Sequence, residues 1–293
     1  MLQKLPLSPP LSVTSAFASA LPHISPPISW EALYGGRTNV AWRGICCDRP
    51  DVVLKLYRGA AQNPLFPNDP LAEARLLDLL EDLNLTPKAC GSFETEDGHC
   101  NVYEHIPGET WHSDTGAVAH LMHTLHQIAP PAGLRKIADG SDELCTQIEE
   151  ILHRCLQTPE ALRRLPTQRI SRSGKTVLLH SDIVPGNLIK NDSGLHLIDW
   201  QCPAAGDPCE DIAVFLSPAM QMLYRKKPLS LAETETFLAR YADRESAERY
   251  RALAPFYHAR MAAYCQWQSE NGQPDYATGV TLECEALQRS LSL

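Results

Sequence analysis

The 293-residue sequence has no apolar run long enough to span a bilayer, so neither a membrane helix nor a membrane partner is expected. It has ten cysteines but no C-x-x-C pair, so the spacing typical of a zinc site is absent. Because most of these cysteines lie in apolar surroundings, we expect reduced core residues and a cytoplasmic protein. The N-terminus, with Lys4 and an Ala-rich stretch at 17–20, is similar to part of a signal peptide, but Pro6, Pro9 and Pro10 interrupt its apolar part, which argues against export.

Positive charge is also scarce, because the net charge is −9 at neutral pH. Nucleic acid requires clustered cations that neutralise its phosphates, so no nucleic-acid partner is expected. The one basic stretch, from Arg163 to Lys175, is interpreted as a solvated connection between a helix and a strand. The apolar content of 44% is that of an ordinary globular protein of one or two domains.

Strand and helix patterns change character near Gly108. Before it, the leucines of 70–83 predict a helix, and apolar runs predict strands over 40–46, 51–57, 90–93 and 100–106. After it, helices are predicted over 112–128, 141–163, 208–225, 231–243, 245–269 and 276–291. The sequence therefore predicts an α+β fold of two domains. The first, at 1–107, is a β-rich nucleotide-binding lobe with a small antiparallel sheet, and the second, at 108–293, is a mainly helical lobe.

The most informative motif is His180-Ser181-Asp182, followed by Asn187 and, after the next apolar strand, by Asp199. In the catalytic loops of kinases, one carboxylate at this spacing orients a substrate hydroxyl and accepts its proton. The amide and the second carboxylate hold Mg²⁺ against the nucleotide phosphates. A surface hairpin with polar ends is the alternative, but an aspartate directly after a strand is harder to obtain by chance.

The segment between Asn187 and Asp199 has the pattern of a hairpin. Two short apolar strands, 188–190 and 195–198, flank a turn at 191–194. Such a hairpin would fold Asn187 back towards Asp199 at its open end.

Lys55 lies within the apolar run of the strand at 51–57, where a buried ammonium needs a partner. Glu73, on the following helix, is the candidate. A lysine held by a glutamate can present a fixed charge to the α- and β-phosphates of a nucleotide. The alternative is an edge-strand lysine that points to solvent.

Two further segments could contact a nucleotide. Gly35 and Gly36 allow close approach of the backbone to a phosphate, although a complete G-x-G-x-x-G is missing. Glu104 and Ile106 lie in the segment that joins the two lobes, where backbone groups could meet the edge of an adenine. The alternatives are an ordinary turn and an ordinary linker.

These motifs together resemble the aminoglycoside phosphotransferase / choline kinase superfamily, which has a protein-kinase-like two-lobe fold. The resemblance covers roughly residues 30 to 270 and rests on three motifs. They are H-x-D-x-x-x-x-N at 180–187, I-D-W at 198–200 and G-D-P-x-x-D-I-A at 206–213. The G-G-x-T-N loop at 35–39 and the V-P-x-N run at 184–187 are similar to the choline, ethanolamine and thiamine kinase branch.

The resemblance implies roles for particular residues. Lys55 and Glu73 would be the phosphate-binding lysine and its partner, and Asp182 the base. Asn187 and Asp199 would be the Mg²⁺ ligands. The nucleotide, ATP, would lie against Gly35, Gly36, Thr38, Asn39, Glu104 and Ile106. His180 and Asp211 are expected to brace the catalytic loop.

Two positions depart from the family pattern. Ser181 replaces the usual Asn or Gly, and Gln201 stands where choline kinases have Glu. Tyr264 and Trp267 are three residues apart on a predicted helix and could box a cationic acceptor by cation–π attraction, with Asp207 adding charge. Packing of aromatic residues in the core explains the pair equally well.

The sequence therefore predicts an ATP- and Mg²⁺-dependent kinase, a monomer or homodimer, that phosphorylates a hydroxyl of choline or a related amino alcohol. Thiamine is the next candidate acceptor and an aminoglycoside-type antibiotic the third. A nucleotide-binding module of the pseudokinase kind, without turnover, is the alternative from a different class. A kinase of macromolecules is disfavoured, because the stretch from Asp199 to Asp211 is too short for an activation segment.

Overall fold

The computed structural model describes residues 6–33, 38–58 and 63–292. The chain forms two compact units by Cα proximity. The first unit is Met1–Glu109 with Ile189–Cys202, and the second is Thr110–Leu188 with Pro203–Leu293. Residues 189–202, which contain most of the hairpin, therefore belong to the first unit, whereas the predicted second lobe at 108–293 included them. Helices and an antiparallel sheet are both present, which confirms the predicted α+β class.

The first unit is built on an antiparallel five-stranded sheet with the order β1-β2-β3-β5-β4. Its strands are β1 (Ser29–Leu33), β2 (Val40–Ile45), β3 (Val52–Tyr57), β4 (Ala89–Thr95) and β5 (Gly98–Glu104). The turn between β4 and β5 requires glycine at position 98. Gly98 has a φ of +134°, and a Cβ there would lie 2.1 Å from the carbonyl oxygen of Tyr57.

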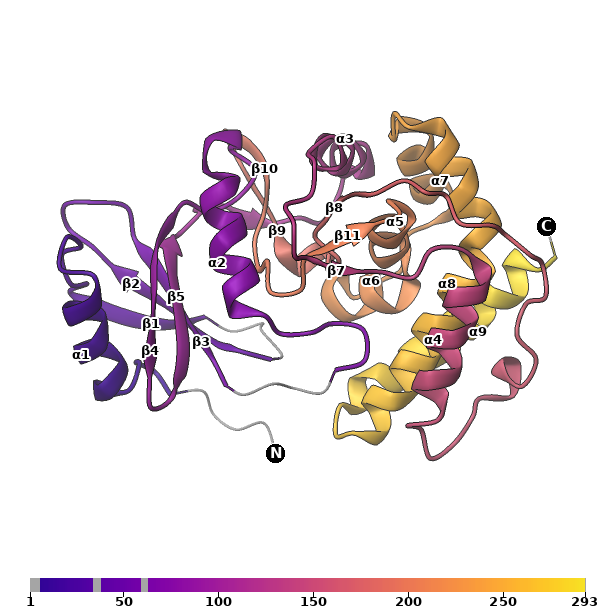
Figure 1. Cartoon of the computed structure of the whole chain (residues 1–293), viewed down its shortest axis with the longest axis horizontal. Coiled ribbons are helices and arrows are strands. Elements are labelled where there is room, and N and C mark those ends of the chain that lie inside the picture. Colours follow the sequence, from indigo (N-terminus) through magenta and orange to yellow (C-terminus); the bar gives the residue numbers. More distant parts are fainter. Residues whose placement is uncertain (1–5, 34–37, 59–62, 293) are drawn as a thin grey trace. The chain divides into compact units, whose positions relative to one another are not determined.

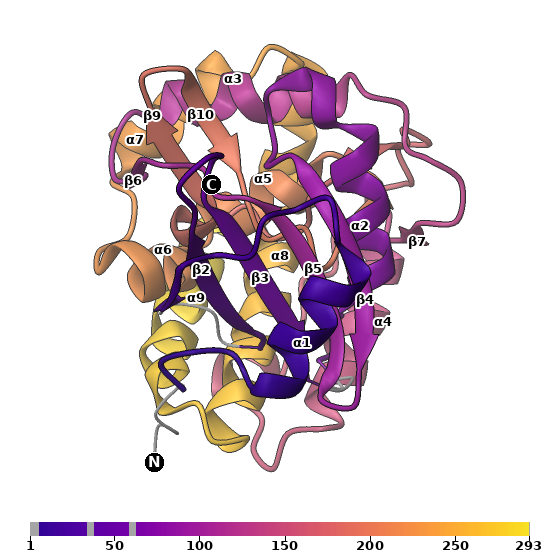
Figure 2. The same ribbon diagram turned by 90° about the vertical axis from the view of Figure 1, so that its left-hand side faces the viewer.

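Helices cover both faces of this sheet, with α1 (Leu11–Ala20) on one side and α2 (Pro70–Leu79) on the other (Figures 1 and 2). Side chains alternate between the faces of a strand, so Val52, Leu54 and Leu56 share one face. These three residues form a core with Val13 and Phe17 of α1. The next residues along β3, Lys55 among them, therefore belong to the face that α2 covers.

Short strands form two further sheets of three strands each. One has the order β10-β9-β6, with β6 (Glu109–Thr110), β9 (Leu188–Asn191) and β10 (Gly194–Leu197). The other has the order β7-β11-β8, with β7 (Arg135–Lys136), β8 (Val177–Leu179) and β11 (Ala204–Gly206). The predicted strands at 188–190 and 195–198 are thus present as β9 and β10.

The second unit is mainly helical. Its α-helices are α3 (Thr115–His126), α4 (Ser141–Leu152), α5 (Cys209–Leu216), α6 (Pro218–Arg225), α7 (Leu231–Arg240), α8 (Arg244–Glu270) and α9 (Ala277–Ser290). Helices α4 and α9 both pack along the long helix α8 (Figure 1). Short 3₁₀ turns are η1 (Glu81–Leu83) in the first unit, and η2 (Glu160–Leu162), η3 (Pro185–Asn187) and η4 (Pro274–Tyr276) in the second.

Three predicted helices differ from the structure in where they end or break. The helix predicted over 141–163 ends at Leu152, because the carboxylate of Glu270 accepts hydrogen bonds from the backbone of Leu156 and Gln157 and holds them in a turn. The helix predicted over 208–225 is broken at Ser217, since a residue that precedes a proline disfavours the α conformation. The helix predicted over 70–83 ends as the α-helix at Leu79 and continues only as η1.

All ten cysteines are free, but the prediction that most of them are core residues was wrong, because six are half-buried or exposed. Four of them are buried, namely Cys100, Cys202, Cys209 and Cys265. Across the described parts of the chain, no helix combines the length and apolar character that a membrane crossing requires.

Candidate active site

Lys55 is buried in the centre of β3, with a relative exposure of only 4%. Its Nζ donates to both carboxylate oxygens of Glu73, at 3.1 and 3.0 Å, and it also donates to Oδ1 of Asp199. The ammonium also lies 4.9 Å from the centre of the Tyr57 ring, close enough for a cation–π contact. The structure thus contains the predicted contact between Lys55 and Glu73 and adds Asp199 to it.

Local sequence fixes Glu73 at this position. Asp69 caps α2 by accepting from the backbone N–H groups of Leu71 and Ala72, and Pro70 occupies the first helical position, where its missing N–H is not needed. Glu73 therefore lies in the first turn of α2, where the helix dipole favours a negative charge. Its oxygens also accept from the backbone of Trp200 at 3.0 Å and from the side-chain amide of Asn101 at 3.3 Å.

The two carboxylates keep Lys55 charged in spite of its burial. Burial alone would lower the pKa of the Lys55 ammonium, but Asp199 and Glu73 outweigh it, so that the pKa lies above its usual value. Burial raises the pKa of the Glu73 carboxyl, and the charge of Lys55 opposes this effect. With both carboxylates ionised, the three side chains carry one net negative charge, which suits a cation.

Asp199 has an unusual backbone conformation, with a φ of +64°. A non-glycine residue rarely adopts this left-handed region, and it persists where the surroundings fix it. The neighbouring Trp200 is fully buried, and its backbone N–H is held by Glu73. The Asp199 side chain keeps 25% of its surface exposed, so its carboxylate is the most accessible of the trio.

The second unit holds the His180–Asn187 loop between β8 and β9. The side-chain amide of Asn187 donates to the backbone oxygen of Asp182 at 2.9 Å and to its Oδ2 at 3.1 Å. Because the nitrogen of Asn187 is used in this way, its amide oxygen is the atom able to bind a cation. The structure therefore brings the predicted base and one predicted metal ligand into direct contact.

Asp211 braces this loop from α5. It is fully buried and accepts from the backbone N–H groups of His180 at 3.0 Å and Ser181 at 2.7 Å. Ser181 has a φ of +62°, so the residue before Asp182 also lies in the left-handed region. This conformation explains why the family pattern has Asn or Gly there, since both adopt it more readily than Ser.

Asp211 is itself held by a pair of buried side chains that the sequence did not indicate. His126 contacts Oδ2 of Asp211 through Nε2 at 3.1 Å and the hydroxyl of Tyr241 through Nδ1 at 2.7 Å. The His126 ring therefore links Asp211 of α5 to Tyr241, the residue that follows α7. No spacing signal links these residues, because they come from three separate helices or helix ends.

The predicted nucleotide contacts are described in part. Gly35 and Gly36 lie outside the described residues. Thr38 and Asn39 directly precede β2, and both are half-buried. Glu104 and Ile106, also half-buried, lie at the end of β5 and just beyond it, where the N–H of Glu104 donates to Lys88 O at 2.8 Å.

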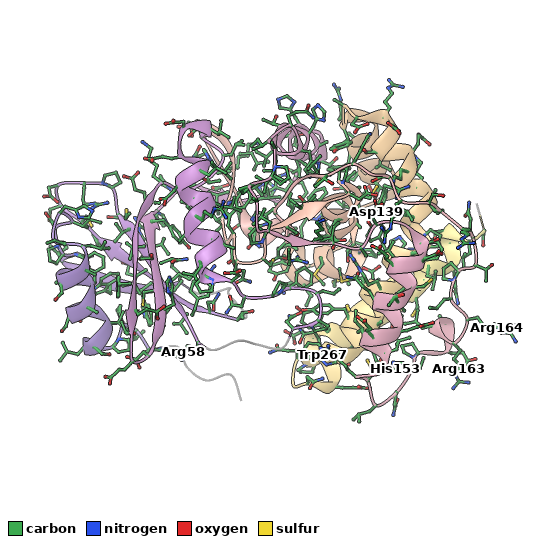
Figure 3. The ribbon with its side chains drawn as sticks, in the orientation of Figure 1. Arg58, Asp139, His153, Arg163, Arg164 and Trp267 are labelled. Carbon is green, nitrogen blue, oxygen red and sulfur yellow. The ribbon has the colours of Figure 1, made fainter. Side chains whose placement is uncertain are left out.

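Tyr264 and Trp267 form a stacked pair near the end of α8, with ring centres 6.1 Å apart (Figure 3 labels Trp267). Tyr264 is almost fully buried, packs edge-on against Tyr276 at 5.8 Å, and accepts a hydrogen bond from Gln268. The pair shares a face as expected. Tyr264 belongs to an aromatic cluster of the core, and Trp267 is the partly exposed member.

The acidic residues that could attract a cationic acceptor are engaged within the protein. Asp207 is buried, and its Oδ2 accepts from Nε of Arg249 at 2.6 Å. Glu210 forms a two-pronged ion pair with the buried Arg260, and Glu270 caps the turn after α4. Their negative charge is thus used to hold second-unit segments together.

Among the residues that the structure describes, no group of three or more His, Cys, Asp or Glu side chains could hold a metal ion. The predicted Mg²⁺ ligands are instead one amide and one carboxylate, Asn187 of the second unit and Asp199 of the first. Both offer the hard oxygen atoms that Mg²⁺ prefers.

Comparison with known proteins identifies the family. The family model of the phosphotransferase enzyme family matches residues 29–264, well over half of the chain. The chain belongs to the phosphotransferase enzyme family. The match includes the Lys55 trio, the His180–Asn187 loop and the brace at Asp211, so the predicted membership is confirmed.

Individual relatives support the same conclusion. Thiamine kinase from Escherichia coli is 35% identical over 114 residues, which is 38% of this chain. The match spans only 41% of the thiamine kinase, about two-fifths of its length.

Two solved structures share the fold. The choline kinase LicA from Streptococcus pneumoniae is 22% identical with a TM-score of 0.64, and the alignment covers 96% of this chain and 98% of that one. A choline/ethanolamine kinase family protein from Mesorhizobium loti is 14% identical with a TM-score of 0.67, covering 96% and 94% of the two chains. These likenesses confirm the predicted kinase-like fold.

Proposed function

We propose that this phosphotransferase is an ATP- and Mg²⁺-dependent kinase that transfers the γ-phosphoryl group to a hydroxyl of a small molecule. The observation that carries the proposal is the buried trio of Lys55, Glu73 and Asp199. A lysine that stays charged between two carboxylates, one of them partly exposed, can bind phosphate oxygens and a divalent cation together. A purely structural ion pair would not need the third, more exposed member.

Each residue has a separate task in this reaction. Lys55 binds phosphate oxygens of the nucleotide, and Glu73 holds its ammonium in place. Asp199 and Asn187 would hold Mg²⁺, which when bound neutralises phosphate charge. Asp182 orients the acceptor hydroxyl and accepts its proton as the oxygen attacks the γ-phosphorus in line with the departing ADP.

The acceptor is best sought first among thiamine-like alcohols. The sequence favoured amino alcohols such as choline, partly because Asp207 could add charge for a cation. Asp207 is paired with Arg249, and the nearby acidic residues Glu210 and Glu270 are also engaged within the protein, so that support is lost. The identity of 35% to thiamine kinase supports thiamine instead, and choline remains the second candidate because Tyr264 and Trp267 stack.

Release of ADP from Mg·ATP in the presence of thiamine, choline, ethanolamine and kanamycin tests the proposal. Asp182→Ala is the test variant, and Asp192→Ala, in the turn between β9 and β10, is the matched control. We expect turnover with one acceptor, lost in Asp182→Ala by a factor of about 10² to 10⁴ and retained in the control.

The alternative of a nucleotide-binding module without turnover predicts a different result. Mg·ATP would then bind, but no acceptor, including those beyond the initial panel, would stimulate ADP release. Equal turnover in wild type and Asp182→Ala would contradict the proposed role of Asp182.

A further inference from the structure

Three amide side chains from distant parts of the first unit meet at Gln201, two residues after Asp199. The Nδ2 of Asn39, at the start of β2, donates to Oδ1 of Asn68 at 2.8 Å and to Oε1 of Gln201 at 2.6 Å. The Nδ2 of Asn68 donates in return to Oδ1 of Asn39 at 2.8 Å. Gln201 is buried, with 7% of its surface exposed, and the two asparagines are half-buried.

The amide of Asn39 is fully used within this network. A side-chain amide has two N–H hydrogens, and those of Asn39 have one acceptor each, in Asn68 and Gln201. Gln201 and Asn68 therefore hold the side chain of Asn39 from two sides.

Gln201 also anchors the segment that carries Asp199. Its backbone oxygen accepts from the N–H of Asp69 at 2.8 Å, directly before α2. One residue earlier, the N–H of Trp200 donates to Glu73 in the first turn of the same helix. Two consecutive residues after Asp199 are thus tied to α2, and the left-handed φ of Asp199 is maintained by these ties.

We propose that Gln201 is a positioning residue that couples the Thr38–Asn39 segment to Asp199. Through its side chain Gln201 holds Asn39, and through its backbone it holds the segment of Asp199. The inference rests on the proposed function, in which Asp199 would hold Mg²⁺, and on the nucleotide contact that the family resemblance implies for Thr38 and Asn39. The coupling sets the spacing between these two groups before Mg·nucleotide binds.

The neutral amide at position 201 suits this task. Lys55 is already paired with two carboxylates. A third carboxylate at a position with 7% exposure would add an unpaired buried charge, which is unfavourable. An amide oxygen accepts from Asn39 without that charge.

The test measures binding of Mg·ADP by titration calorimetry, independently of any acceptor. Gln201→Met keeps the size of the side chain and removes the acceptor oxygen. We expect the dissociation constant for Mg·ADP to rise about five- to tenfold, as the loss of one net hydrogen bond implies. The KM for the acceptor should change less than twofold, which separates positioning of the nucleotide from general loss of structure.

A double-mutant cycle shows whether Gln201 acts through Asn39. In an Asn39→Ala background, Gln201→Met should have little further effect on Mg·ADP affinity, because the coupling is already broken. Asn68→Leu removes the other acceptor of Asn39 and should weaken Mg·ADP binding as well. If Gln201→Met does not fold, Asn68→Leu tests instead whether the position of Asn39 affects Mg·ADP affinity.

Asn191→Ala is the matched control. Asn191 is an amide of the same unit that donates to the backbone of Pro107, outside the network. Its loss should leave Mg·ADP affinity unchanged. The inference is overturned if Gln201→Met leaves the affinity unchanged, or lowers it equally in the wild-type and Asn39→Ala backgrounds. Absence of Mg·ADP binding by the wild-type protein would overturn the proposed function itself, together with this inference.

Discussion

Two buried clusters, one in each unit, hold carboxylates in different ways. In the first unit, Glu73 and Asp199 face the ammonium of Lys55, so one cation is shared by two carboxylates. In the second unit, Asp211 is surrounded by N–H donors from His126 and from the backbone of the loop that it braces. The charged side chains of the first cluster can change partners when a charged ligand binds. The carboxylate of the second cluster holds a backbone segment in place. Substitutions in the two clusters should therefore have different consequences.

The largest effect is expected for Lys55→Met. Removing the ammonium leaves two neighbouring carboxylates without a cation, and breaking a buried ion pair in this way costs about 3–5 kcal/mol of stability. Mg·ADP binding should be lost with it. Urea unfolding and calorimetry measure both effects, with Lys190→Met, at an exposed position of β9, as the control. Equal stability of the two variants would show that the ion pair is not needed.

A smaller and different effect is expected for His126→Phe. Without its donor to Asp211, the loop before Asp182 loses one layer of support, and we expect kcat to fall about tenfold, the equivalent of about 1.4 kcal/mol. Affinity for Mg·ADP should not change. His126→Gln, whose amide can still donate to Asp211, should recover most of kcat. A parallel loss of nucleotide affinity and kcat in His126→Phe would remove the distinction between the clusters.

Ser181→Gly should stabilise the protein by about 0.5–1 kcal/mol. Ser181 has a φ of +62°, which glycine adopts without the steric cost that a side chain imposes. Thermal unfolding measures the change. Ser193→Gly, the same substitution in the turn between β9 and β10, is the control and should be slightly destabilising. If both variants lose stability equally, the backbone at Ser181 is not strained.

The smallest effect concerns an ion pair away from both clusters. Glu233 accepts from Arg225 and closes the capping box of α7 with Ser230, and these contacts lower the pKa of its carboxyl to about 2. A folded-state pKa below the unfolded value of about 4.3 means that the stabilisation is complete above that value and is lost as the pH falls towards 2.

Glu233→Gln should therefore lower stability above pH ~4.3, by less than about 1 kcal/mol because the carboxylate is partly exposed, and the difference from wild type should shrink in acid. Glu160→Gln, which removes a largely exposed pair with Arg163, is the control and should have no measurable effect. A stability difference for Glu233→Gln that does not depend on pH would point to packing instead of charge.

Part of this arrangement could be predicted because local chemistry required it. A lysine inside an apolar strand needs a counter-charge, and Glu73 was the acidic residue at the start of the next helix. The strands at 40–46 and 51–57 agree closely with β2 and β3 because each is a mainly apolar run between turns. The brace at Asp211 followed from the family motif. The roles of Asp182 as the base and of Asn187 and Asp199 as Mg²⁺ ligands stay predictions.

Other contacts had no local signal. His126 and Tyr241 are separated by 115 residues, and Asn39 and Gln201 by 162, so only the folded chain brings each pair together. The break between α5 and α6 did have a local signal, which the prediction of one helix over 208–225 missed: the residue before Pro218 disfavours a helix. The early end of α4 depends on Glu270, more than a hundred residues away.

The most direct measurement compares Asp199→Asn with Asp182→Asn in two assays, binding of Mg·ADP and turnover with the accepted alcohol. We expect Asp199→Asn to lose the Mg²⁺-dependent part of nucleotide binding, and Asp182→Asn to bind Mg·ADP as the wild type does while losing turnover. This result would assign cation binding to the first cluster and the chemistry on the hydroxyl to the loop that Asp211 braces. Normal turnover in Asp182→Asn, or unchanged Mg²⁺-dependent binding in Asp199→Asn, would contradict the assignment.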